Sequence, residues 1–305
     1  MDAIEKNLLK EGAELDALPV GAYNIRANGG LAGRNTTANI DIVTKTDKPG
    51  IDIFIKPGTK NESVHIPVII SRTGLKDLVY NDFHIGADCD VTIIAGCGIH
   101  NCGGGDAQHD GIHTFWLDKN ARLRYVEKHY GEGDGRGKQV MNPTTIVHLG
   151  EGAHMEMETT QISGIDDTIR KTGGDLAAGA SLVVHEKIMT TGDQKAVTDF
   201  NVDLNGDGCS ANVVSRSVAK DTSVQEFISR INGNCACEGH TECDAIIMDH
   251  AKVLASPQLT ANHIDASLIH EAAIGKIAGE QLIKLMTLGL TEQQAEEQIV
   301  NGFLK

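Results

Sequence analysis

Residues 177–188 read AAGASLVVHEKI, and residues 206–218 read GDGCSANVVSRSV. In both stretches a corner that contains glycine is followed by a small residue and then by a short run of alternating aliphatic and polar residues. Alternation with a period of two is typical of a β-strand that buries one face. The two stretches therefore predict two strands, each of which starts at a tight polar turn.

The same unit recurs along much of the chain. Further runs of this kind are IDIFIK, HIPVII, DVTIIA, TTIVHL and HMEMETTQ. Corners of similar composition lie at residues 118–123, 150–155, 177–182, 206–211, 219–224 and 249–254. A repeated corner and strand is what the stacked rungs of a β-solenoid require. A β-sandwich has similar strands, but the repeat and an aromatic content of 4% favour the solenoid.

Helical periodicity occurs at the two ends of the chain. The apolar residues at nearly helical spacing are Ile4, Leu8, Leu9 and Leu15 near the start, and Ile274, Ile277, Leu282, Leu285 and Met286 near the end. The first set predicts a packing helix over residues 2–16, and the second predicts a helix over residues 271–290. Gly289 predicts the end of that helix, and Thr291 predicts the N-cap of another because Gln294 follows three residues later. The two C-terminal helices are expected to cap the solenoid or to dock a partner.

The expected fold is mainly β, with a parallel β-helix as its core. We expect an N-terminal helical segment at residues 1–22, the β-helix at residues 23–268 and a C-terminal two-helix segment at residues 269–305.

Composition and charge restrict the possible partners. The chain has 305 residues, with 27 Lys and Arg against 42 Asp and Glu, which gives a formal net charge of −15. Such a charge repels nucleic acids and anionic membrane surfaces. The sequence has neither a signal-peptide pattern nor a run that approaches the ~18 apolar residues of a membrane span. We expect a cytoplasmic protein that binds neither nucleic acid nor membrane.

The cysteine pattern points to metal chemistry. There are seven cysteines, an odd number, and five of them lie in two short clusters with histidines. Thiolate and imidazole are the donors that zinc, copper or an iron–sulfur cluster needs, so metal ligation explains the pattern better than disulfides do.

The first cluster is CGIHNCGGGDAQHDGIH. It offers Cys97, His100, Cys102, His109 and His113 as candidate ligands, and its glycines allow the backbone to wrap closely around an ion. Alternatively, Cys97 is a small buried hydrophobic residue, because it follows the aliphatic run VTIIAG.

The second cluster is CACEGHTEC. It offers Cys235, Cys237, His240 and Cys243, and Cys243 enters the apolar strand CDAIIM, which would shield a cluster from water. The spacing fits no standard zinc ribbon or ferredoxin run, so a turn of reduced thiols is the alternative.

A third candidate site is the pair His270 and Glu271. These residues precede the predicted helices, where a carboxylate also stabilises a helix N-terminus, so a structural role is the alternative. The chain contains no GxxxxGK[ST] phosphate loop. Any ATPase that acts with it must therefore be a separate chain.

Residues 243–305 resemble the C-terminal core of the SufB/SufD family of iron–sulfur cluster assembly scaffolds. That core has a CD-aliphatic strand, a PxL-type strand and an HEA or HGA turn, followed by a G-[KQ]-[IL]-x-x-[ED]-Q-L helix and an acidic helix that ends in V-x-GF. All of these occur here in order, as CDAIIM, SPQL, HEA, GKIAGEQL and VNGF. The resemblance continues more weakly upstream to about residue 80, and it is to the compact form found in minimal SUF-like systems.

The resemblance implies a parallel β-helix whose C-terminal helices dock a SufC-type ABC ATPase. Cys243 matches the SufB cysteine of the CD strand, Glu271 matches the SufB carboxylate of the HEA turn, and His270 matches the histidine that SufD carries at the SufB/SufD interface. Because one chain carries both kinds of group, we expect a homodimer. The C-x-C pair, Cys235 and Cys237, and the first cluster, around Cys97, are not part of the family pattern. The resemblance therefore implies no role for them.

The expected function is that of a scaffold rather than a catalyst. A transient iron–sulfur cluster would be held by Cys243, Glu271 and His270, with a sulfur donor and recipient apo-proteins as further partners. Two alternatives remain. A β-helix enzyme acting on polysaccharide would use Asp199, Asp203 and Asp207, but it would call for an export signal and aromatic platforms, and the chain has one tryptophan. A zinc-stabilised interaction solenoid would contain zinc without sulfide.

Overall fold

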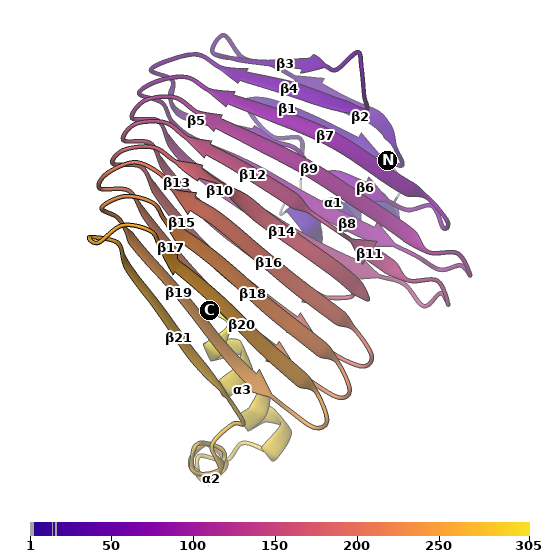
Figure 1. Ribbon diagram of the computed structural model, residues 1–305. Helices are drawn as coiled ribbons and strands as arrows, with labels where there is room; N and C mark the ends of the chain where they lie inside the picture. The colour runs from indigo at the N-terminus through magenta and orange to yellow at the C-terminus, as the bar shows by residue number, and fades with distance from the viewer. Residues whose placement is uncertain (1–2, 14, 16) are drawn as a thin grey trace.

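The computed structural model describes residues 3–13, 15 and 17–305. It is a β-solenoid in which two long sheets face each other, as the repeated corners predict (Figure 1). Sheet A has the spatial order β2 (Gly30–Asn35), β1 (Ala22–Ala27), β5 (Lys60–His65), β8 (Asp90–His100), β10 (Arg122–Glu132), β13 (His154–Ser163), β15 (Ser181–Thr190), β17 (Ser210–Ala219), β19 (Glu238–Ile247) and β21 (Ser267–Gly275), with β6 (Val68–Ile70) beside β1 and β8.

The second sheet, sheet B, is built in the same way. It has the order β20 (Lys252–Ala261), β18 (Val224–Gly233), β16 (Lys195–Leu204), β14 (Asp167–Leu176), β11 (Gln139–Met141), β9 (Ala107–Leu117), β7 (Lys76–Ile85), β4 (Gly50–Ile55) and β3 (Ile40–Thr44), with β12 (Thr144–Leu149) beside β14 and β9. From β13 onward the chain alternates between the two sheets, so each of these strands as far as β19 pairs in parallel with the strand two places later in the sequence. The predicted mainly β fold with a parallel β-helix core is confirmed.

The corners turn through backbone conformations that favour glycine, asparagine and aspartate. Gly179 and Gly208 have φ values of 64° and 73°, and Asp221 and Asp249 both have φ 58°. Side chains with a Cβ rarely adopt this left-handed region, apart from those of asparagine and aspartate. This requirement explains the repeated corner composition.

Between the corners, buried and partly exposed residues alternate along each strand. The burial pattern of β15 is typical, because every second residue from Leu182 to Thr190 is buried. In-register pairing stacks equivalent positions of successive rungs, so that Glu186, Ser215 and Cys243 form one column inside the solenoid. Much of the interior is aliphatic. It also contains the stacked rings of Phe83 and Phe115, whose centroids lie 4.4 Å apart.

The N-terminal helix, α1 (Ala3–Ala13), packs on β6 and β8 through Leu8 and Leu9, as predicted. Residues 2, 14 and 16 of the predicted helix lie outside the described residues. Two glycines of β8 allow the close contact: a Cβ on Gly96 would lie 2.5 Å from Ala13, and one on Gly98 would lie 2.9 Å from Leu8. Gly98 therefore makes room for a helix, which corrects its predicted role of wrapping an ion.

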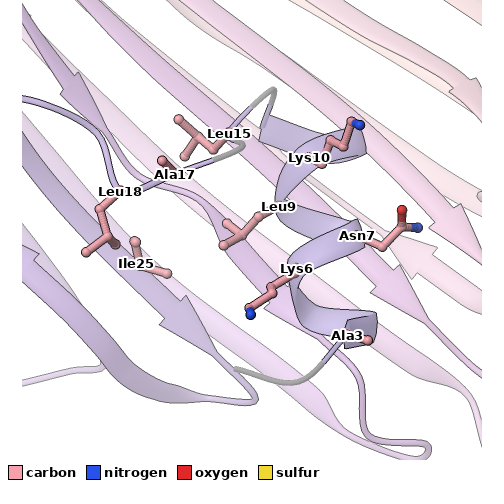
Figure 2. A pocket seen from close by; sticks show the side chains of 9 residues that line it. All are labelled: Ala3, Lys6, Asn7, Leu9, Lys10, Leu15, Ala17, Leu18 and Ile25. Carbon is pink, nitrogen blue, oxygen red and sulfur yellow. The ribbon is translucent and has the colours of Figure 1, made fainter.

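An open, mainly apolar hollow of about 490 Å³ lies between α1 and β1 (Figure 2). Its wall is formed by Leu9, Leu15, Leu18 and Ile25, and Lys6 lies at its margin. The described part of this wall offers no thiol, imidazole or carboxylate, so it is a poor place for the metal chemistry that the cysteines suggest.

The start of the C-terminal helical segment was predicted too early. Residues Ser267–Gly275 form β21, so the predicted boundary between residues 268 and 269 falls inside a strand. Helix α2 spans Gly279–Thr287, and helix α3 spans Glu292–Phe303. The reason is tertiary: backbone pairing with β19 extends the sheet by one more rung and overrides the local helical pattern.

The predicted cap of the last helix is present. The Thr291 hydroxyl accepts from the N–H of Gln294, whose side chain in turn accepts from the N–H of Thr291. Helix α3 packs through Val300 and Leu304 on Val218 of sheet A. Within the described ranges, the helices are too short and too polar to span a lipid bilayer.

Candidate functional site

Cys243 is the thiol at the inner face of β19. Its side chain is 1% exposed and stacks on Ser215 of the preceding rung, which in turn stacks on Glu186. Burial, with the nearby charges of Glu186 and Asp244, raises the pKa of the Cys243 thiol to about 12. The thiol is therefore protonated at neutral pH, and a bound cation would have to displace its proton.

The space around Cys243 is polar although it is enclosed. Thr198 and Ser215 donate hydrogen bonds of 2.8 Å each to the Glu186 carboxylate. Arg170 lies with its Nε 3.5 Å from Glu186 and also pairs with the buried Glu127. Because Arg170 balances these carboxylates, a charged group is tolerated inside the solenoid beside the thiol.

His270 lies on the next strand and faces the same side as Cys243. Its Nδ1 is 2.6 Å from the hydroxyl oxygen of Thr241, a fully buried residue two positions before Cys243. Burial, together with repulsion from His240, lowers the pKa of His270. The imidazole is therefore neutral at pH 7 and has a lone pair available for a metal.

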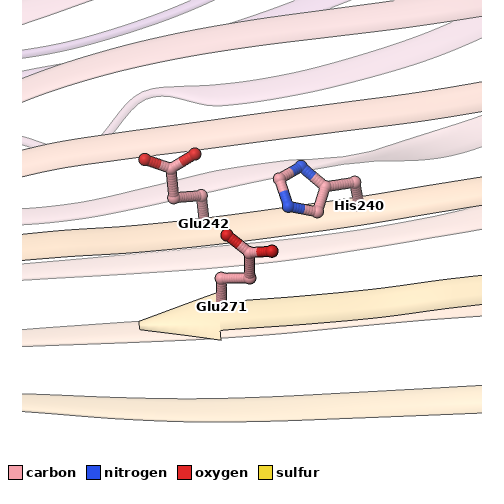
Figure 3. A group of neighbouring side chains, drawn as sticks. All are labelled: His240, Glu242 and Glu271. Atoms are coloured by element: carbon pink, nitrogen blue, oxygen red, sulfur yellow. The ribbon is translucent and has the colours of Figure 1, made fainter. Parts of the chain in front are cut away.

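Glu271 faces the other side of β21, where it meets two residues of β19. Ligand atoms of Glu271, Glu242 and His240 all lie within 4.8 Å of one another (Figure 3). Asn212 lies with its Oδ1 2.9 Å from His240 Nδ1, so Nδ1 donates to the amide and Nε2 keeps a free lone pair. Two carboxylates and one imidazole are suitable donors for a divalent iron, manganese or zinc ion.

Negative charge is crowded at this outer cluster. Burial, and then a hydrogen bond and repulsion from Asp244, raise the pKa of Glu242 above its ordinary value. Sequence reasoning did not select Glu242, because a glutamate on the outer face of a strand resembles a solvated residue. The signal that could have found it is its direct pairing with Glu271 across the two strands.

The three main predicted ligands are thus divided between two faces of the same strand pair. Cys243 and His270 face the interior, whereas Glu271 faces outward with His240. The physical reason is the period of two, since adjacent residues of a strand, such as His270 and Glu271, point to opposite faces. The two groups lie back to back across β19 and β21.

The C-x-C pair lies away from Cys243, at the corner that precedes β19. Cys235 and Cys237 are buried there, and the sulfur atoms of Cys235 and Cys209 lie 3.9 Å apart. Cys209 was not selected from the sequence. Aligning successive rungs could have found it, because Ser210 pairs with Glu238 and so the preceding Cys209 occupies the position of Cys237 one rung earlier.

The first cluster does not form a single site. Cys97 is buried in an apolar cluster, which agrees with its alternative interpretation as a small hydrophobic residue, and His109 and His113 are buried inside β9. His100 and the exposed Cys102 lie together, with Nε2 and Sγ 3.0 Å apart.

Hydrogen bonds hold the two buried histidines of this region. His109 Nδ1 lies 3.2 Å from Asp77, and His113 Nδ1 lies 2.9 Å from the hydroxyl oxygen of Tyr125. Burial lowers the pKa of His113 to about 4. These imidazoles belong to the packed interior of the N-terminal rungs.

The carboxylates proposed for a polysaccharide enzyme are engaged by neighbours. Asp199 pairs with Arg230, and Asp203 accepts a hydrogen bond of 2.8 Å from Asn232. Asp207 accepts a hydrogen bond of 3.3 Å from the N–H of Ala236. All three carboxylates are therefore used in contacts with the next rung.

Comparison with known proteins identifies the family to which this chain belongs. Residues 80–303 match the family model described as SUF system FeS cluster assembly, SufBD core domain. An iron–sulfur cluster assembly SufBD family protein of Methanothermobacter thermautotrophicus is 32% identical over 269 residues, which are 84% of this chain and 62% of the relative. The corresponding protein MJ0034 of Methanocaldococcus jannaschii is 27% identical over 83% of this chain and 79% of its own length.

A third relative shows higher identity over a shorter share of its own length. The SufBD family protein PH1385 of Pyrococcus horikoshii is 38% identical over 84% of this chain and 57% of the relative. This chain thus spans less than two thirds of the length of two of these three relatives. With the family model covering most of the chain, from the middle rungs to α3, this protein belongs to the SufBD family of the SUF iron–sulfur cluster assembly system.

Proposed function

We propose that this chain is a scaffold on which an iron–sulfur cluster is built and from which it is passed to recipient proteins. The observation that carries the proposal is the position of Cys243 and His270 on the same inner face of the last two rungs, where His270 lies opposite Thr241, two residues before Cys243, within the region matched by the family model. A sulfur donor and recipient apo-proteins are the partners that such a role requires.

Cys243 supplies the soft ligand of the cluster. Iron displaces the thiol proton, and the resulting thiolate binds strongly because the surroundings exclude water. The neutral imidazole of His270 is a second, more labile ligand. One strong and one exchangeable ligand suit a cluster that must be both held and released.

The outer cluster of His240, Glu242 and Glu271 holds incoming iron. Oxygen and nitrogen donors bind ferrous iron less tightly than thiolates do, and the crowded carboxylates attract it. The iron at this site is a substrate on its way to the cluster rather than a permanent component.

The open end of the solenoid supports a homodimer. Strands β20 and β21 are the last strands of their sheets, and Leu254, Ile269 and Ile274 on them are at least 39% exposed. A two-fold axis at this edge would pair it with its own copy and bring two Cys243 and His270 sets together.

A separate SufC-type ABC ATPase is the proposed energy source. The sequence has no phosphate loop, and helix α2 exposes Ile283 (62%), with Leu288 (76%) just beyond it. These apolar side chains next to the open end form the proposed docking surface for the ATPase. The scaffold itself would then have no bond-breaking activity.

The test is anaerobic reconstitution with ferrous iron and sulfide. Cys243→Ala should retain less than about a tenth of the iron and acid-labile sulfide of the parent protein, while the free energy of unfolding falls by only about 1–2 kcal/mol. Cys89→Ala is the matched control, because Cys89 is equally buried inside the solenoid but lies at a distant rung. Equal cluster retention in the two variants would refute the assignment of Cys243.

A further inference from the structure

Three thiols meet at one corner of the solenoid, just before β17 and β19. The Sγ atoms of Cys209 and Cys235 are 3.9 Å apart, and the thiol of Cys237 interacts with that of Cys235. All three side chains are at most 6% exposed and none is in a disulfide. The corner therefore presents a compact set of three soft donors.

The spacing of the sulfur atoms fits a shared cation. A metal–thiolate bond to zinc is ~2.3 Å long, so three sulfur atoms around one such ion would lie about 4 Å from each other. The separation between Cys209 and Cys235 has this value before any ion is bound. Little movement of these two side chains is needed for both to bind the same ion.

The absence of a side chain at Gly233 makes room for one of the sulfurs. A Cβ on Gly233 would lie 3.1 Å from the sulfur of Cys237 and 2.9 Å from the Cβ of Ala266. Any larger residue at this position would push Cys237 away from its partners.

The thiols are buried by only one layer of side chains. Asn205, Asp207 and Asn234, which flank them along the chain, are exposed. Asp207 places a carboxylate beside Cys235 and Cys237, where it attracts cations from solvent. Local opening of the corner is enough to admit an ion.

Cys89 shows what an isolated corner thiol looks like in this protein. It occupies the corner before β8, is 1% exposed, and donates to the carbonyl oxygen of Lys56 at 3.1 Å. Packing alone accounts for a single buried thiol of this kind. Three thiols gathered at one corner go beyond what packing requires.

We propose that Cys209, Cys235 and Cys237 form a binding site for one thiophilic cation of the Zn²⁺ or Cu⁺ type, separate from the cluster site at Cys243. Cys243 lies six residues further along, in the middle of β19, and lines a different space with Glu186. A sulfur-only donor set selects soft cations and disfavours the hard ions that the outer carboxylates prefer.

The experiment uses the full chain, reduced and anaerobic, in separate titrations with Zn²⁺ and with Cu⁺ against a chromophoric chelator of each ion. The parent protein should bind one equivalent of at least one ion more tightly than the outer cluster of His240, Glu242 and Glu271 binds it, and Cys235→Ser should weaken that tightest binding by about 100-fold or more. Cys89→Ser and Cys243→Ser should bind as the parent does. The ion should also raise the Tm of the parent but not that of Cys235→Ser, whose metal-free Tm shows whether it is folded.

Three results would overturn the proposal. The first is failure of both ions to compete with the chelators, and the second is equal binding by Cys235→Ser and the parent. The third is a loss of binding in Cys243→Ser that equals the loss in Cys235→Ser. This result would show that the corner thiols and Cys243 belong to one site. If Cys235→Ser does not fold, Cys209→Ser replaces it with the same expected loss. Cluster reconstitution on Cys243 is measured independently, so either proposal can fail alone.

Discussion

The two ends of the solenoid are built differently. At the N-terminal end, β2 folds back antiparallel on β1 and β3 folds back antiparallel on β4, and α1 covers β6 and β8. At the C-terminal end, β20 and β21 are parallel strands of ten and nine residues, and nothing among the described residues pairs with their outer edges. Long uncovered edges are rare in stable monomers, which supports the proposed contact of the C-terminal end with another molecule.

Charges at the two ends differ in the same way. In the N-terminal rungs, burial alone would raise the pKa of Asp77, yet hydrogen bonds from His109 and Arg26 outweigh it and bring the pKa well below its ordinary value. In the last rungs the pKa of Glu242 is raised. Asp77 is paired with Arg26 and His109, whereas the carboxylate of Glu242 lies against a second carboxylate, that of Asp244. This contrast agrees with the proposed cation site in the last rungs.

The largest expected effect comes from placing a charge at each end. Ile53→Asp, at a fully buried position of β4, should lower the free energy of unfolding by about 4 kcal/mol or more, because it buries an unpaired carboxylate. Ile274→Asp, at a 39% exposed position of β21, should change it by less than about 1 kcal/mol. Urea unfolding measures both.

Sedimentation distinguishes the two substitutions further. If β21 is the dimer edge, Ile274→Asp should raise the dimer dissociation constant about tenfold or more, since it places like charges across a two-fold axis. A parent protein that is monomeric at all concentrations would remove the basis of this contrast between the ends.

A smaller effect is expected from Asp77→Asn. Removing the carboxylate leaves Arg26 without its partner, and the free energy of unfolding at pH 7 should fall by about 2–3 kcal/mol. Because the pKa of Asp77 is lowered in the folded state, its contribution is complete above its ordinary pKa of ~3.9 and is lost as the pH falls further. The difference between variant and parent should therefore shrink at pH 3.

Asp175→Asn is the control for this measurement. Asp175 also pairs with a histidine, His148, but its side chain is 48% exposed, so its loss should cost less than about 1 kcal/mol. Equal losses in the two variants would show that the burial of Asp77 does not matter.

The sequence was sufficient to predict the solenoid, because the information is local and repeated. The corner glycines and aspartates mark where the chain turns, and the alternation between them marks each strand. The start of the helix predicted from Glu271 was wrong because the apolar spacing there also fits a strand, and the decisive contact is the pairing with β19, which is remote in sequence. Local patterns do not contain that contact.

The candidate site was predicted in part of its residues but not in its geometry. Cys243, His270 and Glu271 were found by resemblance, yet only the register of β19 against β21 shows that Glu271 faces away from Cys243. Glu242 and Cys209 were missed because each is a candidate ligand only together with a residue one rung away. That residue is Glu271 for Glu242 and Cys235 for Cys209. In a solenoid, side chains at equivalent positions of successive rungs form columns across the strands. These columns cannot be identified until the register of the strands is known.

The smallest expected effect tests the crowded carboxylates directly. In the folded state burial and Asp244 raise the pKa of Glu242, so the parent protein loses stability as the pH rises above the ordinary value of ~4.3. Glu242→Gln removes this penalty and should stabilise the fold by about 0.2–1 kcal/mol at pH 7 but not at pH 4.

Mn²⁺, an oxygen- and nitrogen-liganded substitute for ferrous iron, should raise the Tm of the parent but not that of Glu242→Gln. Glu238→Gln, at an exposed position of the same strand, should behave as the parent in both measurements. A variant that gains no stability at neutral pH and keeps its response to Mn²⁺ would show that Glu242 is an ordinary surface glutamate, and the outer cluster would then lose its assignment while Cys243 kept its own.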